Sequence, residues 1–219
     1  MSQHHQASPT TIPSTGGKLI RWADYYDPLV SLFTLARRSK LRQATVDLAR
    51  LQPGASVLEV GCGTGDVALL ASAQVGASGS VVGIDPSPEM IAVARRKAEK
   101  TGRTVDFQSG VIEALAFADH TFDVVFSSLM MHHLPAEIKQ RGLAEIARVL
   151  KPGGVLVIID MKQARTHRER LVKTLMLHGA MGNGVQHLPP LLQAAGFTQV
   201  ETGDTNLRMV GYVRAHTPA

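Results

Sequence analysis

The sequence contains few of the residues that mark specialised protein classes. Its 219 residues include a single cysteine, Cys62, which excludes an internal disulfide framework and a zinc site built from several cysteines. Aromatic residues make up only 5%, and the sequence has no aromatic-rich basic stripe suited to stacking nucleic-acid bases. No apolar run approaches the roughly 20 residues that span a bilayer. We therefore expect neither a nucleic-acid partner nor a membrane-spanning segment.

The remaining composition predicts one soluble globular domain. Hydrophobic residues make up 44% and charged residues 19% of the chain, as is typical of folded proteins. Residues 1–18 are polar and lack an apolar signal segment, so we expect a flexible tail and a cytoplasmic location. We expect residues 19–219 to form a single domain.

Short β-rich runs alternate with helical patterns along the middle of the chain. The runs predict strands at 56–60, 80–85, 104–109, 122–128 and 154–160. Helices are expected at 65–75, after an N-cap at Ser87 with Pro88 following, and between Ile138 and Val149. This order predicts an α/β fold, a doubly wound sheet of mostly parallel strands. Residues 198–204 and 207–215 lie too close together for a crossover helix, so they predict an antiparallel pair at one edge.

Two helical regions lie outside this alternation. Residues 19–50 are expected to form a lid over the mouth of the site, and residues 162–196 a helical insertion interrupted at 182–184. The segment "KPGG" (151–154) predicts a turn that leads into the fifth strand. Basic residues gather in both helical regions, from Arg37 to Arg42 and from Lys162 to Lys173. They can form solvated helix faces, or a surface for an acidic substrate or anionic lipid head groups.

A glycine-rich loop follows the first predicted strand, in "LEVGCGTGD" (58–66). Its glycines are Gly61, Gly63 and Gly65. Asp66 occupies the place of the third glycine of a dinucleotide fingerprint, and carboxylates at Glu59 and Asp85 flank a loop without Lys or Arg. A cationic ligand without phosphates, such as S-adenosylmethionine, suits this loop better than a pyrophosphate. The alternative is a tight turn that binds nothing.

Four segments, taken in order, form a larger pattern. They are "VLEVGCGTG" (57–65), "GIDPSPEM" (83–90), "FDVVFSSLMMHHLP" (122–135) and "EIARVLKPGGVLVIID" (145–160). In these segments the chain resembles the class I S-adenosylmethionine-dependent methyltransferases, and is similar to the ubiquinone/menaquinone and phospholipid methyltransferases among them. The resemblance implies a seven-stranded sheet whose last strand is antiparallel. It also implies S-adenosylmethionine as the cofactor and S-adenosylhomocysteine as its product.

The resemblance also implies roles for individual residues. The methionine part of the cofactor and its methyl group are assigned to Glu59, Gly61, Cys62, Gly63, Gly65, Ser127 and Ser128. Asp85 is expected to hold the ribose, with Pro86 and Met90 beside the adenine. The family often has an aspartate after the third strand where this chain has Val111, so we expect apolar contact with the adenine from Val111 and Ile112. Tyr26 is expected to close over the cofactor, although it can equally anchor the N-terminal helix.

The adjacent histidines His132 and His133 allow three interpretations: a metal site, a general base, or packing. Adjacent side chains point in different directions and no cysteine lies near, so we expect no metal. Methyl transfer needs a base only where the acceptor must lose a proton, and a neutral histidine suits that role. We therefore name His132 and then His133 as candidate catalytic residues.

These observations predict a methyltransferase acting on a hydrophobic small molecule or lipid-like acceptor, at oxygen, nitrogen or carbon. One alternative is a phospholipid N-methyltransferase that contacts the inner membrane surface peripherally. Another is a protein of the same fold that binds the cofactor without transferring its methyl group. The chain is expected to be a monomer or a homodimer.

Overall fold

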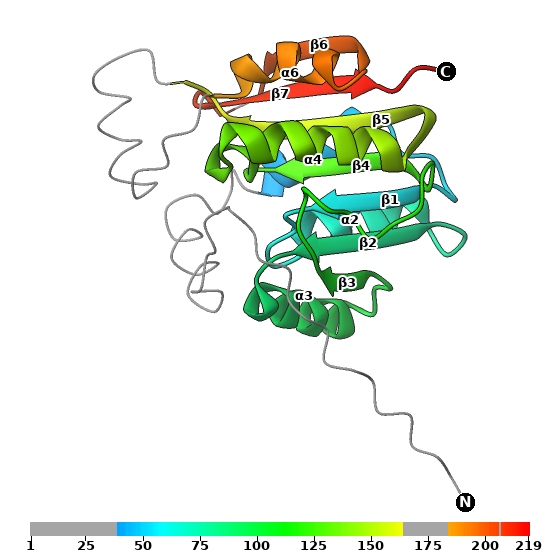
Figure 1. Ribbon diagram of the computed structural model, residues 1–219. Helices are drawn as coiled ribbons and strands as arrows, with labels where there is room; N and C mark the ends of the chain where they lie inside the picture. Colours follow the sequence, from blue (N-terminus) through cyan, green and yellow to red (C-terminus); the bar gives the residue numbers. More distant parts are fainter. Residues whose placement is uncertain (1–38, 164–183, 206) are drawn as a thin grey trace, which may run out of the picture.

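The computed structural model describes residues 39–163, 184–205 and 207–219, and these form a sheet covered by helices on both faces (Figure 1). The strands run in the order β3-β2-β1-β4-β5-β7-β6. Their bounds are Ser56–Val60 (β1), Ser80–Asp85 (β2), Asp106–Ser109 (β3), Phe122–Ser128 (β4), Leu150–Met161 (β5), Thr198–Asp204 (β6) and Val210–His216 (β7). Strand β7 is antiparallel to both of its neighbours, β5 and β6, and the other strand pairs of this sheet are parallel. The predicted fold is confirmed, including the antiparallel last strand.

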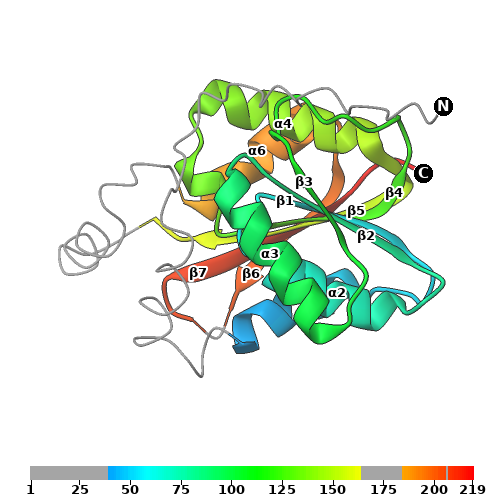
Figure 2. The ribbon, with the colours of Figure 1, turned by 90° about the horizontal axis from the view of Figure 1, so that it is seen from below.

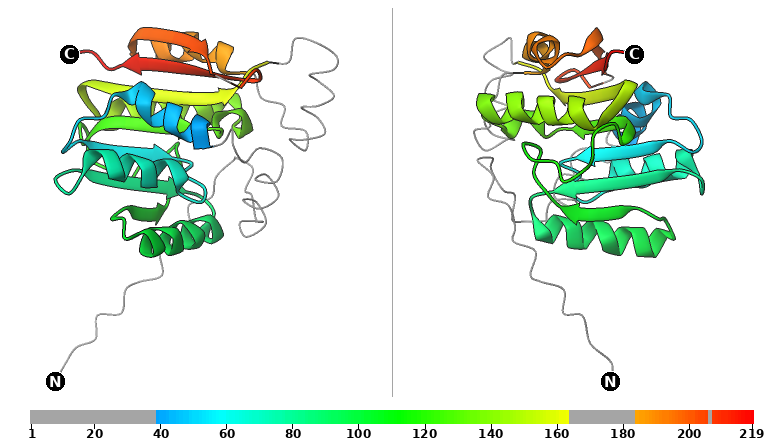
Figure 3. Two further views of the ribbon diagram at one scale, coloured as in Figure 1. Left: turned by 180° about the vertical axis from the view of Figure 1, so that it is seen from behind. Right: turned by 45° about the vertical axis from the view of Figure 1, so that its right-hand side comes forward.

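Helices form the two outer layers (Figures 2 and 3). Their bounds are Asp66–Val75 (α2), Pro88–Thr101 (α3), Ala136–Val149 (α4) and Leu188–Ala194 (α6), with short 3₁₀ turns at Met131–His133 (η1) and Val185–His187 (η2). Helices α2 and α3 and the helical residues 39–49 pack on one face, while α4 and α6 pack on the other. Each face therefore buries one hydrophobic cluster.

Local sequence explains where α3 begins and ends. The Ser87 hydroxyl accepts a hydrogen bond from the Met90 N–H, and Pro88 follows at the first helical position, as predicted. Gly102 ends the helix in the left-handed conformation, at φ 62°. Helix α2 differs, because Gly65 stands at its N-cap position and supplies no side chain to cap it.

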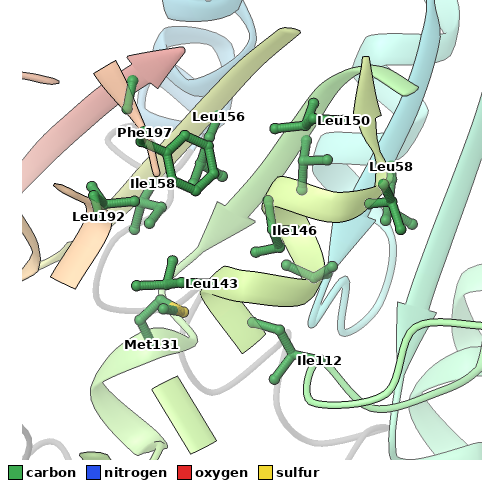
Figure 4. Close-up of a cluster of buried hydrophobic side chains, with 14 of the residues drawn as sticks. Leu58, Ile112, Met131, Leu143, Ile146, Leu150, Leu156, Ile158, Leu192 and Phe197 are labelled. Carbon is green, nitrogen blue, oxygen red and sulfur yellow. The ribbon is translucent and has the colours of Figure 1, made fainter. Parts of the chain in front are cut away.

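Side chains alternate between the two clusters along each central strand. On β5, Leu156 and Ile158 face the cluster under α4, whereas Val157 and Ile159 face the cluster under α2. Figure 4 shows the cluster under α4, which includes Ile158 and the η1 residue Met131. This alternation places Asp160, two residues after Ile158, on the α4 side of the sheet at the carboxyl end of β5.

Strand β5 begins at Leu150, four residues before the predicted start. Leu150 pairs with Phe122, and the next pair is Val155 with Val124, so five steps on β5 match two on β4. The "KPGG" segment is therefore a bulge inside the strand and not a separate turn, with Gly153 at φ 71°. The C-terminal segment fastens it, since the Gly153 N–H donates to the Pro218 carbonyl at 2.9 Å. Strand β3 is shorter than predicted and starts at Asp106.

The described part of the expected N-terminal lid covers the sheet face. In the helical residues 39–49, Leu41, Val46 and Ala49 are buried in the cluster under α2. The rest of that region, like most of the predicted insertion, lies outside the described residues. Of the helices within the described ranges, none is long and apolar enough to cross a membrane.

Arg148 of α4 fastens the loop between β3 and β4. Its guanidinium donates to the carbonyl oxygens of Leu115 at 2.9 Å and Phe117 at 2.8 Å. It also pairs with Asp119 at 2.7 Å and with Glu145 at 2.9 Å. Glu145 in turn accepts the Leu115 N–H at 2.8 Å. One side chain therefore satisfies several backbone groups of a loop that has no regular structure.

We expect Arg148→Ala to lower the free energy of unfolding by about 2 kcal/mol, because it leaves loop carbonyls without charged donors. Arg148→Lys should recover only part of this loss, since one ammonium cannot reproduce the spread of the guanidinium. Urea unfolding measures both changes. The exposed Arg141 on the same helix supplies the control, and Arg141→Ala should change stability by less than about 0.5 kcal/mol. Equal effects of the two alanine variants would contradict this role of Arg148.

Candidate functional site

The predicted site residues gather at the carboxyl edge of the sheet. Strand β1 lies between β2 and β4, and the strand order reverses there. The loops that follow β1, β2 and β4 are therefore neighbours, and in open α/β sheets ligands bind at such a reversal. The predicted residues on these loops, the strand ends and the first turn of the helix after β2 are Glu59, Gly61, Cys62, Gly63, Gly65, Asp85, Pro86, Met90, Ser127 and Ser128. Tyr26 lies outside the described residues.

The three loop glycines differ in their surroundings, although all have positive φ angles. A Cβ atom at Gly61 would collide with the Met130 side chain, and one at Gly65 would lie 2.5 Å from Phe107 Cζ. A Cβ atom at Gly63 would meet nothing within 4 Å. Gly61 and Gly65 are thus required by packing, whereas the backbone at Gly63 is open to a ligand.

Gly63→Ala is expected to weaken cofactor binding about tenfold or more, because a methyl group would fill the space beside the open backbone. Gly102 offers a matched control, since it is also left-handed, at φ 62° against 52°, and also has nothing within 4 Å. Both alanine variants should lose about 1 kcal/mol of stability to backbone strain. Calorimetric titration should show weakened binding of S-adenosylmethionine in the Gly63 variant alone. Equal affinities in the two variants would place the ligand elsewhere.

Glu59 caps helix α2 from outside the helix. Its side-chain Oε2 accepts the Ala68 N–H at 2.8 Å, and the residue is only 2% exposed. Burial raises the pKa of the Glu59 carboxyl well above its usual range, against the opposing effect of the Ala68 hydrogen bond. A helix N-terminus ordinarily favours phosphate. Here a protein carboxyl already occupies that position, so the loop is unsuited to a pyrophosphate.

The basic residues beside the loop are paired with Asp66. Arg42 Nη2 lies 2.5 Å from Asp66 Oδ2, and Lys97 Nζ lies 3.1 Å from Asp66 Oδ1. Lys97 also donates to the Thr64 hydroxyl at 2.8 Å. These pairs hold the outer side of the loop in place. They leave Glu59 and Asp85 as the acidic groups contributed by the ends of β1 and β2.

Asp85 connects the loops that follow β1 and β2. Its Oδ2 accepts the Gly63 N–H and its Oδ1 accepts the Ser87 N–H, each at 2.9 Å. Burial raises the pKa of the Asp85 carboxyl, while the hydrogen bonds from Ser87 and Gly63 oppose the increase. Each oxygen keeps a further lone pair. Asp85 can therefore hold the glycine loop and still accept the hydroxyl groups of a ribose.

The predicted adenine-binding residues are mostly enclosed. Pro86 is half-buried, Met90 is 3% exposed and Val111 is 4% exposed. Ile112 belongs to the hydrophobic cluster shown in Figure 4 and packs against Gly142 of α4. Val111 pairs with Ala114 in an isolated bridge. The structure thus places Pro86 in the loop after β2, Met90 in the first turn of α3, and Ile112 in the core.

The two predicted serines at the end of β4 face opposite sides of the sheet. Ser127 is fully buried, and its Oγ has no hydrogen-bond partner among the described residues. Ser128 is half-buried and, by the alternation of the strand, faces the opposite side. Leu129 follows at φ 55° and donates its N–H to the Ile159 carbonyl at 2.8 Å. A left-handed leucine is uncommon, and such strain concentrates at functional sites.

His132 forms a buried pair with Asp160. The His132 N–H donates to Asp160 Oδ2 at 2.9 Å, and His132 Nδ1 is hydrogen-bonded to Asp160 Oδ1. The two side chains are 3% and 2% exposed. Within the described residues, His132 Nε2 is buried and has no partner. His133 is half-buried, with its ring centroid 3.9 Å from that of His132.

Sequence reasoning missed Asp160. The available signal was an acidic residue at the end of a predicted strand, the same feature that identified Asp85. Among the residues described by the structure, no group of three His, Cys, Asp or Glu side chains is arranged to hold a metal ion. The two histidines differ in burial, and the His132 ring contacts the carboxylate of Asp160.

Comparison with known proteins adds to this geometry. Residues 57–154 match a family model described as a methyltransferase domain. The chain is 37% identical over 139 residues to the demethylmenaquinone methyltransferase of Shouchella clausii, and the alignment covers 63% of this chain and 58% of that relative. The chain thus spans less than two thirds of the length of this curated relative.

Solved structures share the fold. A SAM-dependent methyltransferase from Aquifex aeolicus aligns with a TM-score of 0.62 and 25% identity, over 80% of this chain and 88% of its own. The [4+2]-cyclase SpnF aligns with a TM-score of 0.68 and 23% identity, over 82% of this chain and 80% of its own. At such low identity the likeness to the cyclase shows a common fold alone.

Proposed function

We propose, on the premise that residues 57–154 match the model of a methyltransferase domain, that the protein transfers a methyl group from S-adenosylmethionine to a hydrophobic acceptor of the quinol type. The observation that carries the cofactor assignment is the acidic glycine loop. Its open backbone at Gly63 lies beside Asp85, and Glu59 closes the N-terminus of α2.

The described residues fit S-adenosylmethionine in their chemistry. The cofactor carries a sulfonium, an ammonium and a ribose but no phosphate, so it needs acidic groups and hydroxyl acceptors. Glu59 and Asp85 supply these, and the carboxylate of Asp85 retains lone pairs for the ribose. A dinucleotide would need free N–H groups at the start of α2, where the Ala68 N–H is already bonded to Glu59.

The acceptor class is supported by the relatives. The Shouchella clausii protein is a demethylmenaquinone methyltransferase, and it is 37% identical to this chain over 139 residues. Quinols are apolar rings that carry acidic hydroxyl groups, and their natural forms reside in membranes. We therefore assign a hydrophobic aromatic acceptor, met at the membrane surface by peripheral contact.

The residues of this chain align the methyl group with the acceptor, shield it from water and deprotonate the acceptor. When bound, S-adenosylmethionine supplies an activated methyl group on sulfur. Asp85 and the glycine loop orient that group, and the buried strand ends exclude water from it. We assign His132 the role of general base, because its unpartnered Nε2 can take the hydroxyl proton of the acceptor. His133 packs against His132 and helps to hold its ring.

Two measurements test this function. Calorimetry should detect binding of S-adenosylmethionine and none of NADH. Incubation with methyl-labelled cofactor should then label a 1,4-dihydroxynaphthalene that carries a short prenyl tail. Labelling of phosphatidylethanolamine vesicles instead would favour the phospholipid alternative. Cofactor binding with no transfer to any acceptor in a quinol and lipid extract would reject the methyltransferase assignment in favour of a reaction that retains the methyl group.

A further inference from the structure

His132, in the turn after β4, and Asp160, at the end of β5, form a buried pair of ionisable side chains, and the sequence did not single out its acidic member. We infer that Asp160 is a positioning residue that holds His132 with Nε2 directed to the acceptor as a base. This inference rests on the proposed function, since it concerns the acceptor side of the same site.

Asp160 holds both the backbone and the ring of His132. One oxygen accepts the His132 N–H at 2.9 Å, and the other is bonded to His132 Nδ1. That second oxygen also accepts the Met161 N–H, at 2.6 Å, which fixes the carboxylate relative to β5. The ring therefore cannot rotate without breaking a hydrogen bond in a site almost closed to water.

The carboxylate also selects the tautomer. An ionised Asp160 can only accept a hydrogen bond, so against this carboxylate the neutral imidazole carries its proton on Nδ1 and its lone pair on Nε2. This is the form required of a base that acts through Nε2. The same arrangement, an aspartate that orients a histidine, serves nucleophilic hydrolases.

The unpartnered Nε2 indicates a ligand. Buried polar atoms in folded proteins almost always have a hydrogen-bond partner, and an orphan calls for an explanation. Strands β4 and β5 are neighbours, and His132 follows β4 at the same edge as the glycine loop. A hydroxyl group of the acceptor would give Nε2 its missing partner. A purely structural clamp would need Asp160 to bind the backbone, but would not require Nε2 to be left without a partner.

The proposed step begins with deprotonation of the acceptor and ends with a methyl group on its ring carbon. Nε2 takes the proton of the acceptor hydroxyl, and Asp160 stabilises the imidazolium that forms. The electron pair of the resulting phenolate moves into the ring, whose carbon bonds to the methyl group while the S–C bond breaks with its pair retained by sulfur. The ring carbon then loses its proton and the phenolate oxygen recovers one. In total one methyl group is gained by the acceptor and one proton is released.

A double-mutant cycle tests the dependence of Asp160 on His132. Asp160→Asn keeps the shape of the side chain but places an amide NH₂ group or a weaker acceptor against Nδ1, which favours the wrong tautomer. We expect Asp160→Asn and His132→Ala each to lower kcat on the prenylated dihydroxynaphthalene by about 10²-fold or more. The double variant should be no more than about threefold slower than the slower single variant, because residues that act as a unit are non-additive. The dissociation constant for S-adenosylmethionine should stay within about threefold.

Acceptor acidity provides a readout that a structural role would not move. An electron-poor phenol that is already ionised at the assay pH needs no base, so the variants should lose far less activity on it. Asp123→Asn is the matched control: Asp123 also accepts a backbone N–H, from Ser56 at 2.8 Å, but at the opposite edge of the sheet. Asp123→Asn should leave unchanged the ratio of the activity on the prenylated dihydroxynaphthalene to the activity on the ionised phenol.

The tautomer can be read in the folded wild-type chain, so the test does not depend on variants that fold. Nitrogen-15 NMR of the histidine rings should show neutral His132 protonated at Nδ1. A proton on Nε2, or additive losses that are equal for the two acceptors, would overturn the role of Asp160. Methyl transfer by the wild type distinguishes these results from failure of the proposed function. Absence of any transfer would reject the function and, with it, this inference.

Discussion

Replacing Asp85 with alanine is expected to weaken binding of S-adenosylmethionine by about 100-fold or more. In the proposed function the carboxylate accepts two ribose hydroxyls, and each hydrogen bond to a charged group contributes about 1.5–3 kcal/mol. The substitution also removes the acceptor of the Gly63 and Ser87 N–H groups, which loosens the cofactor loop. Isothermal titration calorimetry at neutral pH measures the change directly.

Asp123→Ala separates this effect from general destabilisation. Asp123 accepts the Ser56 N–H and pairs with Lys151 at 2.8 Å, at the edge of the sheet away from the glycine loop. The control should lose stability and keep its affinity for the cofactor. Equal affinity losses in the two variants would mean that Asp85 does not hold the ribose.

The binding should also depend on pH. Burial raises the pKa of the Asp85 carboxyl above the usual value of an aspartate. As the pH falls through that raised pKa, the carboxylate gains a proton and loses its capacity as a double acceptor. The affinity of the wild type should therefore fall on acidification at a higher pH than a free aspartate, at about 3.9, would cause. The Asp85→Ala variant should lack this part of the pH dependence.

Glu59→Gln is expected to change how stability depends on pH. Because burial raises the pKa of Glu59, the folded state holds a proton that the unfolded state has already released. The stability of the wild type therefore falls as the pH rises from about 4.5, the ordinary value, to the raised folded pKa. The slope from this group approaches about 1.4 kcal/mol per pH unit and ends above the folded pKa. Glutamine has no titratable proton, so Glu59→Gln removes this slope.

Urea unfolding of both proteins from pH 4.5 to 8 provides the measurement. The free energy of unfolding of Glu59→Gln, relative to the wild type, should increase with pH across this range. Other carboxyl groups are common to both proteins and largely cancel. Parallel pH profiles would show that Glu59 titrates as an exposed glutamate does.

Much of the fold could be predicted because its signals are local. The periodicity of Val and Ile runs identified the strands, and Ser87 with Pro88 identified the start of α3, since capping depends on residues three positions apart. The departures occur where distant chain segments meet. The bulge at "KPGG" is held by contacts to Thr217 and Pro218, more than sixty residues away, and no local pattern contains that information.

The features of the site also divide into those that the sequence determined and those that depend on the tertiary structure. The sequence alone determined the spacing of the glycines and the presence of Asp85 and Asp160 at strand ends, because composition and order are its content. Only the tertiary structure decided that Gly63 is open while Gly61 and Gly65 are packed, and that Glu59 caps α2. It also joined His132 to Asp160 across 28 residues. Those outcomes depend on which strands become neighbours, and that order arises from the packing of the whole sheet.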